Sequence, residues 1–81
     1  MSRVLIVDDE ASICWAFGEF LGDLGHDVAV ASSAEEGLDA ARDNPFDAVV
    51  LDVRLPGMDG LSAMPAFRER VGDAPIIIVT A

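Results

Sequence analysis

Three aspartates and a threonine follow short apolar runs of this 81-residue chain, where their oxygen atoms could act together. Asp8 and Asp9 come directly after the run at 4–7, Asp52 after the run at 48–51, and Thr80 after the run at 76–79. Carboxylates about 4 Å apart repel by roughly 4 kcal/mol at an effective dielectric near 20, so a cluster needs a proton or a cation. An all-oxygen ligand set in an open crevice favours Mg²⁺, which makes phosphoryl chemistry the first hypothesis.

The apolar runs predict parallel β-strands. The runs at 4–7, 48–51 and 76–79 are continuous rather than alternating, as is typical of strands that are covered on both faces. A weaker run at 28–31 is expected nearer an edge of the sheet. Strands separated by helices need parallel, right-handed crossovers, so the sequence predicts a three-layer α/β fold in the order βαβαβαβ.

Helical spacing predicts three helices between these strands. The first has an inner face of six residues, namely Ile13, Ala16, Phe17, Phe20, Leu21 and Leu24, with Gly25 just beyond its end. The second begins with a capping box at 33–36 and ends at Asn44-Pro45. The third is expected from Asp59-Gly60 to about Arg70, with a kink or a late start because of Pro65.

In an open parallel sheet, ligands bind beyond the carboxyl ends of the strands. If the strands at 4–7 and 48–51 are neighbours, Asp8, Asp9 and Asp52 share one crevice. The alternative is that Asp8 or Asp9 caps the first helix and Asp52 begins a turn. We favour the shared site, because three acids and a hydroxyl at three strand ends are unexpected by chance.

Composition excludes several other functions. Fifteen acidic side chains against five arginines give a net charge of −10, which argues against binding nucleic acid or an anionic membrane. Cys14 is the single cysteine, so no internal disulfide can form and a reducing, cytoplasmic compartment is expected. The residues before Asp8 are too few for a signal peptide or a membrane span. His26 is interpreted as a solvated turn residue.

The sequence resembles the receiver domain of two-component response regulators over its whole length. The similar stretches are residues 4–10, 47–52, 55–60 and 76–81. The resemblance implies a flavodoxin-like, doubly wound parallel sheet with strand order 2-1-3-4-5. It also implies a regulatory domain rather than an enzyme, which takes a phosphoryl group from a histidine kinase and controls an output such as transcription.

The resemblance assigns roles to individual residues. Asp52 would accept the phosphoryl group. Asp9 and Asp52 would bind Mg²⁺ together with the main-chain carbonyl of Arg54, while Asp8 would act largely through water. Thr80 would be the switch hydroxyl that turns toward the phosphorylated aspartate.

The chain departs from the family pattern at its C-terminal side. It contains no lysine, whereas the family uses one at the end of a fifth strand that is absent here. Residues 1–81 are therefore expected to be the N-terminal two-thirds of a receiver, with strands 2-1-3-4 and impaired phosphoryl transfer. The open edge of the strand at 76–79 predicts homodimers or swapped oligomers.

Two further hypotheses concern output and activity. Residues 12–15 and 57–61 are similar to NtrC-type receivers, which control sigma-54 activator ATPases, so a DNA-binding or ATPase output domain is expected outside this chain. The missing lysine favours the alternative of a pseudo-receiver, a binding scaffold without phosphoryl transfer. A phosphohydrolase is disfavoured because Arg54, and not an acid, stands two residues after Asp52.

Overall fold

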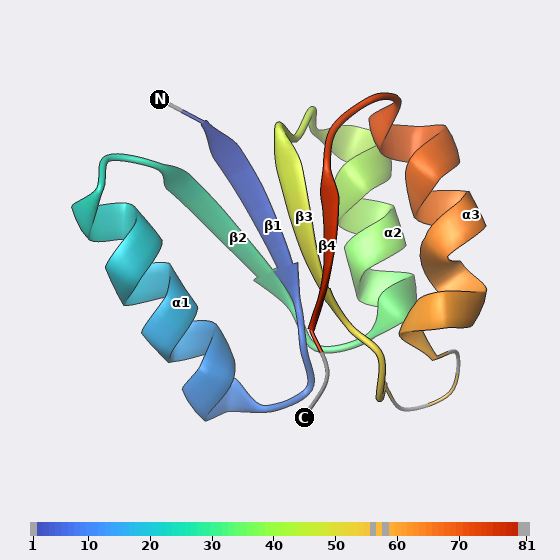
Figure 1. Ribbon diagram of the computed structural model, residues 1–81, viewed down its shortest axis with the longest axis horizontal. Coiled ribbons are helices and arrows are strands. Elements are labelled where there is room, and N and C mark those ends of the chain that lie inside the picture. Colours follow the sequence, from blue (N-terminus) through green and yellow to red (C-terminus); the bar gives the residue numbers. More distant parts are fainter. Residues whose placement is uncertain (1, 56, 58, 80–81) are drawn as a thin grey trace.

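The computed structural model describes residues 2–55, 57 and 59–79. Strands and helices alternate along the chain, as the apolar pattern predicts (Figure 1). The elements are β1 (Arg3–Val7), α1 (Ala11–Asp23), β2 (Asp27–Ala31), α2 (Ala34–Asp43), β3 (Ala48–Asp52), α3 (Gly60–Val71) and β4 (Ile76–Val79). Pro65 lies inside α3, which begins at Gly60, so the late start allowed for at Pro65 does not occur.

The four described strands form one parallel sheet in the order β2-β1-β3-β4. This confirms the predicted order and places the weaker run at 28–31 on an edge. β1 and β3 are central neighbours, and Val7 pairs with Leu51 in their register. The residues that follow β1 and end β3 therefore meet at the same edge of the sheet.

The helices make two outer layers around the sheet. α1 lies on one face, while α2 and α3 lie side by side on the other (Figure 1). Leu5 and Val7 of β1 point into the larger core with Phe67 of α3, and Val4 and Ile6 point into the smaller core under α1. Because successive side chains of β1 enter opposite cores, its run must be apolar throughout.

The inner face predicted for α1 is only partly correct. Phe17 and Leu21 pack on the smaller core together with Cys14, but Phe20 is 64% exposed and Leu24 is 60% exposed. α1 packs mainly on β1 and β2, so its apolar arc is wider than the surface that it covers. The adjoining surface over β3 and β4 is a groove of about 380 Å³.

The helix ends follow from local hydrogen bonds. Ser33 accepts a bond from the backbone N–H of Glu36 at 3.1 Å, which confirms the predicted start of α2. The Glu36 carboxylate accepts from the hydroxyl of Ser32 at 2.9 Å rather than closing the box on Ser33. Asp59 caps α3 by accepting from the N–H of Ser62 at 2.8 Å. None of the described helices is long and apolar enough to cross a membrane.

Candidate metal centre

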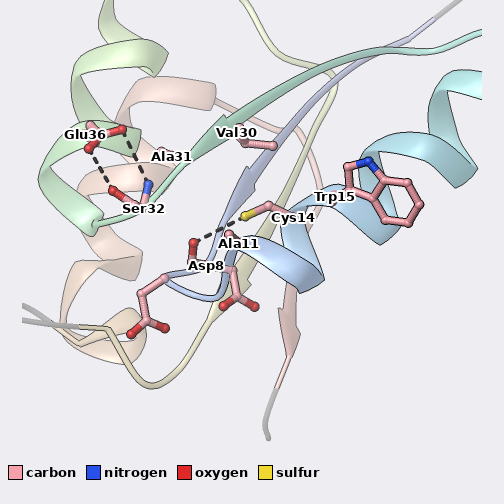
Figure 2. A pocket seen from close by; sticks show the side chains of 9 residues that line it. Asp8, Ala11, Cys14, Trp15, Val30, Ala31, Ser32 and Glu36 are labelled. Atoms are coloured by element: carbon pink, nitrogen blue, oxygen red, sulfur yellow. Dashed lines mark hydrogen bonds between the residues drawn. The ribbon is translucent and has the colours of Figure 1, made fainter.

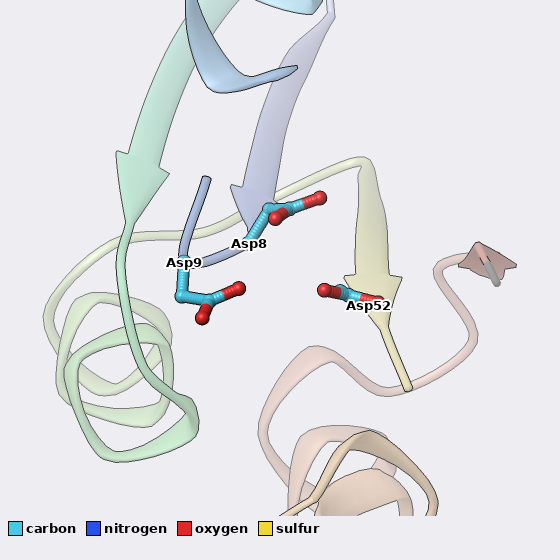
Figure 3. A group of neighbouring side chains, drawn as sticks. All are labelled: Asp8, Asp9 and Asp52. Carbon is cyan, nitrogen blue, oxygen red and sulfur yellow. The ribbon is translucent and has the colours of Figure 1, made fainter. Parts of the chain in front are cut away.

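Three carboxylates gather where β1 and β3 end. Asp8 and Asp9 follow β1, Asp52 is the last residue of β3, and the three side chains surround a common space (Figure 3). One carboxylate oxygen from each residue lies within 4.8 Å of the others. The parallel register of β1 and β3 thus brings together the three acids that the sequence singled out.

Each buried aspartate uses one oxygen in a local turn. Asp8 Oδ1 accepts from the N–H of Glu10 at 2.9 Å, and Asp52 Oδ1 accepts from the N–H of Arg54 at 3.1 Å. The N-cap of α1 is Glu10, with no side-chain cap, so the alternative that Asp8 or Asp9 caps this helix is wrong. The turns hold the carboxylates in place and leave a second oxygen on each for a ligand.

Bringing the three carboxylates together costs electrostatic free energy when no cation is bound. Asp8 is 7% exposed and Asp52 is 6% exposed, whereas Asp9 is exposed. Burial raises the pKa of Asp8, the N–H of Glu10 lowers it, and the charges of Asp52 and Asp9 raise it further, so the net shift is upward. Among residues 2–55, 57 and 59–79, ion pairs join Arg42 to Asp39 and Asp43, and none reaches the three site acids.

The donor set fits a small, hard cation. Mg²⁺ takes oxygen ligands in octahedral geometry, and it usually binds one or two carboxylates while keeping several waters. Carboxyl oxygens within 4.8 Å of one another are close enough for all three acids to take part in one such site, directly or through water. A divalent ion would also remove the repulsion that no described basic side chain offsets.

The structure describes only one of the two remaining predicted site residues, which are Arg54 and Thr80. Arg54 follows β3 and is exposed, and its backbone N–H donates to Asp52. Its carbonyl as a metal ligand stays a prediction. Thr80, the predicted switch hydroxyl, lies outside the described residues, and its role also stays a prediction.

A groove of about 420 Å³ borders the acids between α1 and β2 (Figure 2). Its lining is mainly apolar and includes Cys14, Val30 and the exposed indole of Trp15. Cys14 Sγ donates to the main-chain carbonyl of Asp8 at 3.3 Å. Burial, followed by the charge of Asp8, raises the pKa of the Cys14 thiol, which therefore keeps its proton for this bond. This bond was not predicted from the sequence, where Cys14 was considered only as a single cysteine that cannot form an internal disulfide.

The importance of one glycine at this site was also not predicted from the sequence. Gly60, the first residue of α3, lies so close to Asp52 that a Cβ atom on Gly60 would overlap the Asp52 carbonyl oxygen. The sequence signal was the Asp59-Gly60 pair, which was interpreted as a helix start and as part of the stretches that carry the family resemblance.

Comparisons with known proteins agree with this geometry. The family model for the response regulator receiver domain matches residues 4–81. The chain is 39% identical over 79 residues to the transcriptional regulatory protein DltR of Streptococcus agalactiae, covering 98% of the chain and 35% of DltR. It is 41% identical over 81 residues to the transcriptional regulatory protein AfsQ1 of Streptomyces coelicolor, covering all of the chain and 36% of AfsQ1. The chain thus spans about a third of the length of these relatives.

Solved structures show the same fold. A CheY-like receiver domain protein from Methanospirillum hungatei superposes with a TM-score of 0.95 at 30% identity, over 99% of this chain and 64% of that one. The chemotaxis protein CheY4 of Vibrio cholerae superposes with a TM-score of 0.91 at 34% identity, over 96% of this chain and 67% of that one. These similarities confirm the flavodoxin-like arrangement that was predicted for the sheet.

Proposed function

This chain belongs to the response regulator receiver domain family, and on that premise we propose that Asp52 accepts a phosphoryl group from a histidine kinase when Mg²⁺ is bound. The observation that carries the proposal is the gathering of Asp8, Asp9 and Asp52 at one sheet edge without a basic partner among the described residues. Such a cluster suits a cation and, through it, a phosphoryl group.

The proposed ligand roles are those that the resemblance to receiver domains implies. Asp9 and Asp52 would bind Mg²⁺ directly with the carbonyl of Arg54, and Asp8 would act largely through water. The ion supplies charge neutralisation at the transferring phosphoryl group. Asp52 is nearly buried and fixed by the Arg54 N–H, so its free oxygen has one preferred direction.

The proposed step is a nucleophilic displacement on phosphorus. A carboxylate oxygen of Asp52 attacks in line, the P–N bond to the kinase histidine breaks, and its electron pair leaves with the imidazole, which takes up a proton. The product is an acyl phosphate on Asp52. The added phosphoryl oxygens would accept a hydrogen bond from Thr80, which biases the surrounding loops toward a second arrangement.

The proposed output is the control of transcription, because the named relatives are transcriptional regulatory proteins. A sigma-54-dependent ATPase is the more specific output, supported by the similarity of residues 12–15 and 57–61 to NtrC-type receivers. ATP hydrolysis that rises on phosphorylation of the natural full-length protein would support it, and DNA binding without ATPase activity would contradict it.

The proposal is tested with the longest natural protein that contains residues 1–81. It is incubated with Mg²⁺ and acetyl phosphate, and acid-stable but hydroxylamine-labile phosphate is measured by mass spectrometry. We expect an adduct on the wild type and on Asp39→Asn, a control that changes an exposed carboxylate of α2. An equal adduct on Asp52→Asn would show that the acceptor is a different residue.

The alternative candidate is a pseudo-receiver. It keeps the acidic site as a binding scaffold without phosphoryl transfer. The two candidates differ in one outcome of the same assay, because a scaffold would bind Mg²⁺ while no adduct forms with acetyl phosphate or with a phosphorylated kinase.

A further inference from the structure

We propose that Gly60 is a positioning residue for the Asp52 site, a role that rests on the proposed function of Asp52. The missing side chain of Gly60 lets the first turn of α3 lie against the main chain that carries Asp52 and Val53. Gly60 thereby fixes the positions of the phosphoacceptor Asp52 and of Arg54, whose carbonyl is a proposed metal ligand.

The contact involves main-chain atoms only. A Cβ atom on Gly60 would lie 2.9 Å from the carbonyl carbon of Asp52 and 3.0 Å from Cα of Val53, and would overlap the Asp52 carbonyl oxygen. Carbon atoms in ordinary contact are about 3.5–4.0 Å apart. Main-chain atoms cannot rotate away as the end of a flexible side chain can. Any side chain at position 60 must therefore shift the end of β3 or the start of α3 by about 1 Å.

Space, and not backbone conformation, requires glycine here. The described glycines with positive φ are Gly25, Gly57 and Gly72, and Gly60 is not among them. Its helical backbone would accept any L-residue. The requirement for glycine at position 60 thus comes from the approach of α3 to Asp52.

The end of β3 has little freedom to absorb such a shift. The N–H of Val53 donates to the Val79 carbonyl of β4 at 3.1 Å, and the Val53 carbonyl accepts from the N–H of Gly60 at 2.9 Å. Asp52 and Val53 are therefore held between β4 and α3. A displacement passes into the turn in which Arg54 N–H donates to Asp52 Oδ1, and both residues are proposed ligands.

The test compares two alanine substitutions that both crowd a neighbour. Gly60→Ala crowds the Asp52 main chain, whereas a Cβ on Gly37 of α2 would lie 2.8 Å from Val7 Cγ2 and 2.9 Å from Phe67 Cζ, which are side-chain atoms of the core. We expect both variants to lose stability. Only Gly60→Ala should bind Mg²⁺ about 10- to 100-fold more weakly in isothermal titration calorimetry, which is the usual effect of disturbing the support of a metal ligand.

The possible results distinguish the positioning role of Gly60 from the proposed function of Asp52, on which this role rests. A folded Gly60→Ala variant that binds Mg²⁺ within about twofold of the wild type would overturn the positioning role. A wild-type chain that binds no Mg²⁺ would overturn the proposed function, and this inference with it.

A measurement on the wild type covers the case in which Gly60→Ala does not fold. The amide resonance of Gly60 should shift during a Mg²⁺ titration with the same midpoint as metal binding. Gly22 of α1, which has no neighbour within 4 Å of its Cβ position, is the internal reference and should not shift. A Gly60 amide that stays unchanged while Mg²⁺ binds would contradict the coupling.

Discussion

Carboxylate oxygens of Asp8 and Asp52 lie within 4.8 Å of each other, although both residues are buried, with exposed fractions of 7% and 6%. Like charges this close destabilise the metal-free protein, because burial weakens their screening by water. The site that is suited to Mg²⁺ therefore lowers the stability of the fold that builds it.

Asp8→Asn should stabilise the metal-free protein at pH 7. The substitution removes one like charge, and the amide oxygen of Asn can still accept from the N–H of Glu10. We expect the free energy of unfolding to rise by about 1 kcal/mol in urea titrations. Asp39→Asn, on the exposed face of α2, should change it by less than about 0.5 kcal/mol. A clear loss of stability in Asp8→Asn would contradict the repulsion.

The increase in unfolding free energy that Asp8→Asn gives over the wild type should become smaller as the pH falls. The folded protein raises the pKa of Asp8, so it binds this proton more tightly than the unfolded chain does. The resulting stability is fully present below the unfolded pKa, about 3.9, and is lost as the pH rises through the folded pKa. Unfolding free energies of both proteins, measured from pH 7 to about pH 4 in EDTA, should converge. A difference in unfolding free energy between the wild type and Asp8→Asn that grows toward low pH would contradict this prediction.

The Cys14 thiol should be slow to alkylate. Burial and the charge of Asp8 raise its pKa, and only the thiolate reacts. We expect iodoacetamide to modify Cys14 at pH 8 several-fold more slowly than a free thiol with a pKa of about 8.5, and Asp8→Asn to increase this rate. Mass spectrometry of quenched samples gives both rates. An Asp8→Asn rate equal to that of the wild type would show that the charge of Asp8 does not reach the thiol.

The main features of the site could be predicted from sequence because they depend on local pattern and on parallel topology. Continuous apolar runs mark strands that are covered on both faces, and parallel strands end at one edge, so Asp8, Asp9 and Asp52 had to meet if β1 and β3 were neighbours. The start of α2 at Ser33 also follows from local hydrogen bonding.

Other features depend on how the elements pack, which the sequence does not encode locally. Phe20 and Leu24 satisfy the helical spacing of α1, yet they are exposed because the apolar arc is wider than the surface beneath it. The bond from Cys14 to the carbonyl of Asp8 and the approach of Gly60 to Asp52 join elements whose distance is set by tertiary packing. The role of Thr80 stays a prediction, because this residue lies outside the described part of the chain.

The central claim is that Asp8, Asp9 and Asp52 share one divalent ion, and a calorimetric Mg²⁺ titration tests it most directly. We predict one site per chain in the wild type and in Asp39→Asn, with binding at least about tenfold weaker in Asp9→Asn and in Asp52→Asn. Affinities for Mg²⁺ that are the same in all four proteins would contradict the claim.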